Sequence, residues 1–278
     1  MLGDRNFFLE QYGPWALIAG ASEGIGLDFA QQLAAKGINL VLLSRSGEKL
    51  RVAANAITAL HNVDIRMIEA DLSHSDCLVP IAEATHDIDI GLMIYNAGAV
   101  HSAEFFLDQS LESQLALINL NCRSPLALAH HFAQPMRERE RGGMIFLSSM
   151  AAFAGGSYVA TYAGTKAFDI VFPQSLWHEL APHNVHVMSL VAGATRTPAM
   201  AAAGLDLTEQ QDGGPAIMDA VDVAIEGLAK LGEEPVWIAG EHNRQAAEFF
   251  ATLPRKDLIN AMSMGTAGLF NQSFIPAN

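Results

Sequence analysis

The chain has 278 residues, half of them hydrophobic, and its 30 acidic and 16 basic residues leave a net charge of −14. A chain this acidic is repelled by phosphate backbones and anionic lipid surfaces, which argues against nucleic acid or a membrane as a partner. Two cysteines, Cys77 and Cys122, are too few for a disulfide framework or a structural metal site, and the first residues lack the apolar core of a signal peptide, so we expect a cytoplasmic protein.

Short apolar runs alternate with helix-length segments along the chain. The predicted strands are residues 15–19, 39–44, 64–69, 90–95, 144–148, 185–191 and 236–239. The predicted helices are residues 27–36, 46–61, 111–138, 159–180 and 219–231. Strands that alternate with helices form parallel sheets through right-handed crossovers, and continuously apolar strands are buried on both faces. The pattern predicts an α/β chain with one Rossmann-type domain over residues 1–278, a doubly wound parallel sheet with helices on both faces. It leaves residues 254–278 unassigned.

The segment GASEGIG, residues 20–26, fits two motifs. Gly20, Ser22 and Gly24 match G-x-S-x-G, the turn that carries the nucleophile of many hydrolases. The glycines also match the turn that brings a helix N-terminus to a dinucleotide pyrophosphate. The hydrolase motif follows several strands, whereas this segment follows the first predicted strand. We therefore favour a dinucleotide turn.

A tyrosine and a lysine one helical turn apart are the second signal. Tyr162 and Lys166 stand at i and i+4 of a predicted helix and so share a face. A free phenol has a pKa of about 10, and a nearby cation favours the phenolate. Ser149 follows the predicted fifth strand, at the sheet edge where open α/β folds bind ligands. The three residues indicate proton transfer at that edge.

A proline in the long predicted helix marks a third position. Pro125 follows Asn121 by four residues and has no N–H to give to the Asn121 carbonyl. We expect that carbonyl to be unpaired and the helix to kink there. A free carbonyl in a polar recess is a good water site. The alternative is that Pro125 only kinks a packed helix.

These motifs, in this order, resemble the short-chain dehydrogenase/reductase family over residues 15–198. The matching positions are the glycine turn, Asp71-Leu72, Asn96-Ala97-Gly98, Asn121, Ser149, Tyr162, Lys166, Gly193 and Thr197. The resemblance implies that Tyr162 is the general acid/base and that Lys166 assists it and binds the nicotinamide ribose. It also implies that Ser149 orients the substrate carbonyl and that Asn121 holds a water.

The expected cofactor site gathers residues from both halves of the chain. It consists of Gly20, Ser22, Glu23, Gly24, Ile25, Gly26, Ser44, Arg45, Asp71, Leu72, Asn96, Ala97, Gly98, Tyr162, Lys166 and Thr197. Members that prefer NAD usually end the second strand with an acidic residue, which repels a 2′-phosphate. Here Ser44 removes that repulsion and Arg45 can pair with the phosphate. We expect NADP(H) to be preferred over NAD(H), although Glu23 places a negative charge near the phosphates.

The expected substrate site is apolar. Its predicted residues are Ser149, Met150, Tyr158 and Tyr162, with a mobile lid at about residues 193–215. An apolar, water-excluding lid favours a hydrophobic ketone or alcohol over a sugar or a phosphorylated metabolite. Arg196 is a cation in this lid; we expect it to face solvent, and the alternative is that it anchors a carboxylate.

Three histidines near the sixth strand raise the question of a metal site. His178, His183 and His186 are close in sequence, but Pro182 interrupts the helix between them and no carboxylate converges on them. We expect solvated loop histidines and no metal.

The resulting prediction is an oxidoreductase that transfers a hydride between a nicotinamide cofactor and the alcohol or carbonyl of a small hydrophobic substrate. The alternative is a non-catalytic NADP(H)-binding sensor on the same fold, since fold does not imply chemistry. Apolar side chains on the helices at 111–138 and 159–180 also predict a homodimer or homotetramer.

Overall fold

The computed structural model describes residues 5–98, 104–205, 216–274 and 276. Seven strands form one parallel sheet in the order β3-β2-β1-β4-β5-β6-β9. They are β1 (Trp15–Ala19), β2 (Asn39–Ser44), β3 (Ile65–Glu69), β4 (Ile90–Tyr95), β5 (Gly142–Ser149), β6 (Val185–Ala192) and β9 (Val236–Ile238). Every predicted strand is confirmed within two residues at each end. The chain order reverses between β1 and β4, the point where such sheets bind ligands.

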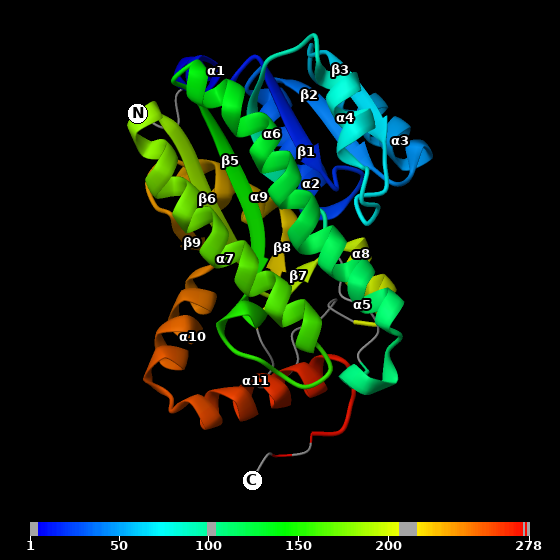
Figure 1. Cartoon of the computed structure of the whole chain (residues 1–278), viewed down its shortest axis with the longest axis vertical. Coiled ribbons are helices and arrows are strands. Elements are labelled where there is room, and N and C mark those ends of the chain that lie inside the picture. The colour runs from blue at the N-terminus through cyan, green and yellow to red at the C-terminus, as the bar shows by residue number, and fades with distance from the viewer. Residues whose placement is uncertain (1–4, 99–103, 206–215, 275, 277–278) are drawn as a thin grey trace.

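Helices cover both faces of the sheet. One face carries α2 (Gly24–Ala35), α3 (Gly47–Thr58) and α9 (Ala220–Lys230), together with α1 (Arg5–Tyr12). The other face carries α4 (Leu78–Thr85), α6 (Ser124–Glu138) and α7 (Ala160–Leu180). In Figure 1, α6 and α7 lie in front of the sheet and α2 and α9 behind it. Neighbouring strand residues such as Leu17 and Ile18 enter opposite clusters, as the period of two requires. The doubly wound fold is therefore confirmed.

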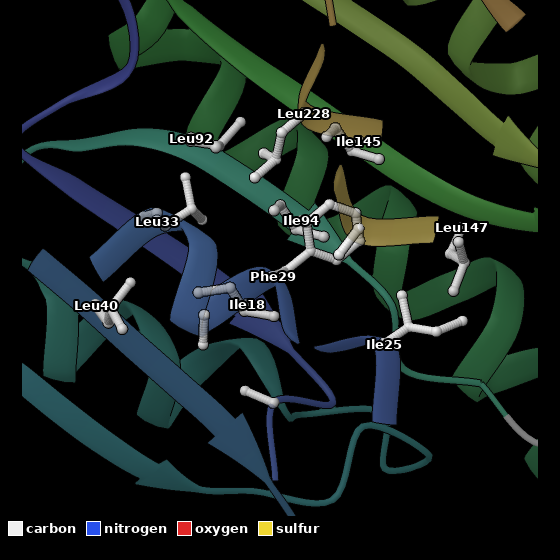
Figure 2. Close-up of a cluster of buried hydrophobic side chains, with 14 of the residues drawn as sticks. Ile18, Ile25, Phe29, Leu33, Leu40, Leu92, Ile94, Ile145, Leu147 and Leu228 are labelled. Atoms are coloured by element: carbon white, nitrogen blue, oxygen red, sulfur yellow. The ribbon is translucent and has the colours of Figure 1, made fainter. Parts of the chain in front are cut away.

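The core holds the start of α2 in place. Figure 2 shows Phe29 of α2 among side chains from β1, β4, β5 and α9, including Ile18, Ile94 and Leu228. All four residues are almost completely buried, and each such side chain contributes about 1.5–3 kcal/mol by burial. This packing fixes α2 against the sheet, and with it the glycine turn that precedes the helix.

The long helix predicted at 111–138 is two helices joined by a π-helical turn. They are α5 (Leu111–Ile118) and α6, with the turn at Asn119–Arg123. The N–H of Ser124 reaches the carbonyl of Asn119, five residues back. Pro125 lacks an N–H, so the regular i→i−4 ladder is broken one turn before it. The helix is irregular near Asn121, as predicted, and the irregularity is a π turn. That the Asn121 carbonyl is unpaired stays a prediction.

Several helices were not predicted. Besides α1 and α4 they are α8 (Pro198–Ala202), α10 (Glu241–Thr252) and α11 (Arg255–Leu269), and a short pair of strands, β7 (Thr195–Arg196) and β8 (Met218–Asp219), follows the main sheet. The tail thus forms α11, which crosses beneath the carboxyl end of β5 and the start of α7 (Figure 1). The lid predicted at 193–215 contains β7 and α8, and its residues 206–215 lie outside the described part. Across the described helices, none is both long and apolar enough to cross a membrane.

Candidate active site

Three glycines shape the turn between β1 and α2. Gly20 (φ +80°) and Gly24 (φ +58°) have left-handed backbone conformations. A Cβ on Gly26 would lie 2.1 Å from the Gly20 carbonyl oxygen, which also accepts a hydrogen bond of 2.9 Å from Asn96 Nδ2. Helix α2 begins at Gly24, and the side chain of Glu23 does not cap it. Its first N–H groups therefore suit an anion, and this cradle fits a dinucleotide pyrophosphate.

The end of β2 is tied to this turn. Ser44 Oγ donates to Ser22 Oγ at 3.0 Å, which brings the predicted ribose end next to the glycines. Arg45 is exposed beside it. Lys49 Nζ lies 2.7 Å from Glu23 Oε2, so the negative charge noted in the sequence has a cationic partner. The sequence did not reveal this role of Lys49, which stands in the first turn of α3, five residues after β2 ends.

The remaining predicted cofactor residues border the same edge of the sheet. Asp71 accepts two hydrogen bonds from Ser73. Burial would raise the pKa of Asp71, but these bonds and the charges of Arg45 and His74 outweigh burial and lower it. The Leu72 carbonyl accepts a hydrogen bond from Ser124 Oγ. A Cβ on Gly20 would lie 3.0 Å from the backbone of Ala97, so the glycine turn and the segment after β4 are in close contact.

Thr197 lies next to Gly24 of the glycine turn. Its Oγ1 accepts a bond from Met200 N and caps α8. A Cβ on Gly24 would lie 3.1 Å from Thr197 Cγ2. The start of the predicted lid therefore lies against the glycine turn. Ile25, in contrast, is a core residue whose side chain belongs to the same buried cluster as Phe29.

Lys166 is buried and held by two acceptors. Its Nζ donates to the Leu147 carbonyl at 2.7 Å and to Asp169 Oδ2 at 2.9 Å. Burial by itself would lower the pKa of Lys166, but the charges of Asp169 and Tyr162 and the bond to Asp169 outweigh it, so this pKa is raised. Asp169 was missed because the sequence does not reveal that it is buried.

Asn121 joins the lysine from the π turn. Its Nδ2 donates to Thr165 Oγ1 at 2.9 Å, and its Oδ1 is buried without a hydrogen-bond partner among the described residues. A Cβ on Gly98 would lie 3.3 Å from Lys166 Nζ and 3.6 Å from Asn121 Oδ1. The structure thus brings Gly98, Asn121 and Lys166 together, and their unused polar atoms suit a bound water or a ligand hydroxyl.

Ser149 and Tyr162 are both partly buried near this cluster. Ser149 ends β5, and its Oγ accepts a bond from Ala151 N. Tyr162 lies in the first turn of α7, and its backbone carbonyl accepts a hydrogen bond from Thr165 Oγ1. Met150 begins the 3₁₀ turn Met150–Phe153, which packs against α7. The predicted catalytic residues therefore come from adjoining ends of β5, α7 and the π turn.

The predicted substrate residue Tyr158 is fixed by distant parts of the chain. It is non-glycine at φ +70°, its hydroxyl donates to the Ser273 carbonyl at 2.5 Å, and its ring stacks on Phe105 with centroids 4.6 Å apart. Ser157 N also donates to Ser263 Oγ of α11. The tail thus adjoins the expected substrate side, which sequence reasoning could not place.

Arg196 and His186 both have partners from adjacent elements, and for His186 this corrects an expectation. Arg196 was expected to face solvent, and it is exposed, with its guanidinium 2.8 Å from Asp219 Oδ1 across the β7–β8 pair. His186, at the start of the predicted sixth strand, was expected to be solvated, but it is partly buried, and Tyr12 Oη is 2.7 Å from its Nδ1. Burial lowers the pKa of His186. Adjacent elements supplied partners that spacing alone could not show.

Comparison with known proteins places this site in context. A family model described as short chain dehydrogenase matches residues 14–207. A 7β-hydroxysteroid dehydrogenase of Clostridium sardiniense is 32% identical over 255 residues, covering 91% of this chain and 95% of that protein. A human protein named inactive hydroxysteroid dehydrogenase-like protein 1 is 33% identical over 192 residues, 68% of this chain and 58% of that one.

Solved structures share the fold as well. A 7β-hydroxysteroid dehydrogenase structure has a TM-score of 0.84 and 30% identity, covering 92% of this chain and 98% of the other. A short-chain dehydrogenase from Sphingobium yanoikuyae in complex with NADPH has a TM-score of 0.77 and 30% identity, covering 86% and 93%. The family-model match over residues 14–207 includes the glycine turn, strands β1 to β6 and the helix of the Tyr–Lys pair.

Proposed function

The chain belongs to the short-chain dehydrogenase/reductase family, and from this premise we propose that it transfers a hydride between NADP(H) and a bulky hydrophobic alcohol or ketone, with hydroxysteroids as the leading class. Members of the family are oxidoreductases, and this activity on a hydroxyl or carbonyl group is the chain's function. The observation that best supports the detailed proposal is the cluster in which Lys166, Asn121 and Gly98 meet beside β5.

Tyr162 is the proposed general acid/base. In reduction its hydroxyl donates a proton to the carbonyl oxygen, and in oxidation the phenolate accepts the proton of the alcohol. Lys166 favours the phenolate by its charge, consistent with the electrostatic interaction between the two side chains. The Ser149 hydroxyl donates to the substrate oxygen and orients it. When bound, the nicotinamide supplies or accepts the hydride.

The proposed preference for NADP(H) rests on charge at the end of β2. Ser44 takes the place of an acidic residue, and Arg45 is exposed where a 2′-phosphate would be recognised. The pairing of Glu23 with Lys49 removes the main objection to this preference. A related structure that holds NADPH supports the same choice.

A hydrophobic substrate is proposed from the residues near Ser149 and from the relatives. Met150, Phe153 and Tyr158 supply apolar surface, and α11 adjoins them. The relatives named as 7β-hydroxysteroid dehydrogenases act on a rigid, largely apolar skeleton. The lid role of residues 193–215 stays a prediction.

A panel of ketones tests this function. Purified protein is incubated with NADPH and ketones that range from 7-oxosteroids through bulky aliphatic ketones to polyhydroxylated sugars, and NADPH oxidation is followed at each concentration. We expect the highest kcat/KM for the steroid or another bulky apolar ketone. A preference for charged or polyhydroxylated members contradicts the substrate proposal.

The rival is a dinucleotide sensor without turnover. The similarity to relatives named inactive favours keeping it as a second candidate. Against it, Asn121, Ser149, Tyr162 and Lys166 are all present, and a sensor has no need of a tyrosine acid–base pair. NADPH binding without turnover of any ketone in the panel supports the sensor.

Assembly and location are also proposed. The α5 side chains Leu111, Leu115 and Ile118 are exposed, as is Leu126 at the start of α6. Such a surface suits a two-fold interface in a homodimer or homotetramer. Light scattering at micromolar concentration tests this, and a monomer contradicts it. We further expect the protein in the cytoplasm.

A further inference from the structure

Lys166 and Asp169 form a buried ion pair on one face of α7. The two residues are three positions apart, and 5% and 1% of their surfaces are exposed. Strand residues form hydrogen bonds with the backbone of both residues. Ser148 Oγ donates to the Lys166 carbonyl and Ser189 Oγ to the Asp169 carbonyl, each at 2.7 Å. The pair is thus clamped between α7 and strands β5 and β6, which α7 crosses in Figure 1.

A gain in folding stability does not by itself explain why this buried ion pair is present. Removing two charges from water is costly, and well-packed apolar residues often replace a buried ion pair without loss. Here the cost is increased because Asp169 Oδ1 has no hydrogen-bond partner within the described ranges. What the carboxylate does supply is a negative charge 2.9 Å from Lys166 Nζ.

The two acceptors also fix where the ammonium points. A lysine ammonium has three N–H donors, and Leu147 O and Asp169 Oδ2 take two of them. Leu147 is two residues before Ser149 on β5, so Nζ is anchored to the strand that carries the proposed substrate-orienting residue. The third donor remains for the side of Gly98, where an added Cβ would lie 3.3 Å from Nζ and 3.6 Å from Asn121 Oδ1.

Other titratable groups near the pair cannot take over the role of Asp169. Tyr95 of β4 and Cys122 of the π turn interact electrostatically with Asp169, and Cys122 and Tyr162 interact with Lys166. Burial first, and then the Asp169 charge, raises the pKa of Cys122 to about 11 and that of Tyr95 above its ordinary value. Tyr95 and Cys122 are therefore uncharged near neutral pH and offer no counter-charge to the lysine.

We propose that Asp169 is a positioning residue, whose carboxylate keeps the Lys166 ammonium charged and directed toward Tyr162 and the cofactor side. This inference rests on the proposed roles of Tyr162 and Lys166. Without the carboxylate, a lysine this deeply buried loses its proton at a lower pH, and the Tyr162 phenolate then loses the cation that favours it.

The first test compares pH profiles. kcat for oxidation of a 7β-hydroxysteroid with NADP⁺ is measured from pH 6 to 10 for the wild type, Asp169→Asn and a control, Glu233→Gln. Glu233 pairs with Lys230 at the same i,i+3 spacing, but at the surface. We expect Asp169→Asn to move the midpoint of the rise in kcat to higher pH by roughly one unit or more. The control leaves it in place. An unmoved midpoint, or one moved to lower pH, overturns the proposal.

The second test does not need activity. Melting temperatures are measured for Lys166→Met, Asp169→Leu and the double variant. We expect each single variant to melt at least about 5 °C lower, because it leaves one buried charge unpaired, and the double variant to recover much of that loss. Additive losses overturn the proposal. If the wild type turns over no substrate, the proposed function fails, while this cycle still decides whether the two charges depend on each other.

Discussion

Lys49 Nζ lies 2.7 Å from Glu23 Oε2 and joins the start of α3 to the start of α2. The glutamate immediately precedes the helix whose first N–H groups form the proposed phosphate site. The two side chains are 58% and 33% exposed, so solvent and salt screen the pair. Its main effect is then on ligand charge recognition and not on stability.

Removal of Lys49 is expected to weaken NADPH binding. In Lys49→Met the Glu23 carboxylate faces the phosphates unpaired, and the Kd for NADPH rises about twofold to fivefold at low salt. Fluorescence titration measures this, and the difference shrinks at high ionic strength. The double variant Glu23→Gln/Lys49→Met is the control and regains wild-type affinity. Equal affinities for the wild type and Lys49→Met contradict the prediction.

A single acidic residue at the end of β2 is expected to reverse the cofactor preference. Ser44→Asp places a carboxylate where NADP(H) carries its 2′-phosphate, and the preference for NADPH over NADH falls on the order of 10–100-fold. Side-by-side titrations with both cofactors measure the ratio. Ser44→Ala also loses the bond to Ser22 but adds no charge, so it separates the two effects. Tighter binding of NADH than NADPH by the wild type refutes the underlying assignment.

Loss of the Tyr162 hydroxyl is expected to abolish most turnover. Tyr162→Phe lowers kcat by about 10²–10⁴-fold, the usual contribution of a general acid or base, and keeps the Kd of NADPH within a few fold. Tyr12→Phe is a matched control, since that hydroxyl bonds His186 far from the proposed site. A Tyr162→Phe variant with the wild-type kcat rules out the mechanism.

Strand positions were predictable because parallel strands buried on both faces are continuous apolar runs. The limits of β1, β2 and β4 follow directly from that pattern. Helices α1 and α4 were not predicted because they are short, and Pro80 interrupts the polar pattern at the start of α4. α10 and α11 have only one and three buried residues, so their apolar periodicity is weak.

The candidate site divides in the same way. Glycine spacing and the Tyr–Lys spacing are local, and they located the turn and the face of α7 from sequence. The partners of Glu23, Lys166 and His186 were missed because each depends on burial or on a contact between separate elements. Asp169 follows Lys166 by three residues in the sequence, but only the burial of Asp169 shows that the two side chains form a buried ion pair.

Acid is expected to destabilise the fold through His186. Burial lowers the pKa of this residue, so below about pH 6.5 the unfolded chain takes up a proton that the folded chain excludes. The free energy of unfolding therefore falls on acidification, by at most about 1.4 kcal/mol per pH unit for one group, and is unaffected above that range.

Urea denaturation of the wild type and His186→Gln between pH 5 and 8 measures this effect. Subtracting the two curves removes the titration of other groups. We expect the wild type to show the steeper loss of stability below pH 6.5. Parallel curves for the two proteins would mean that the pKa of His186 is the same in the folded and unfolded states, which contradicts the prediction.

Under the proposed function, the contact between Tyr158 and the tail separates substrate selectivity from catalysis. The bonds from Tyr158 to Ser273 and from Ser157 to Ser263 join the loop after Ser149 to a segment that lies beyond the matched family region 14–207. Neither bond involves a residue of the glycine turn or of α7. Under the proposed function, substitutions in residues 255–273 are therefore expected to change substrate selectivity while the proposed residues of proton and hydride transfer stay the same.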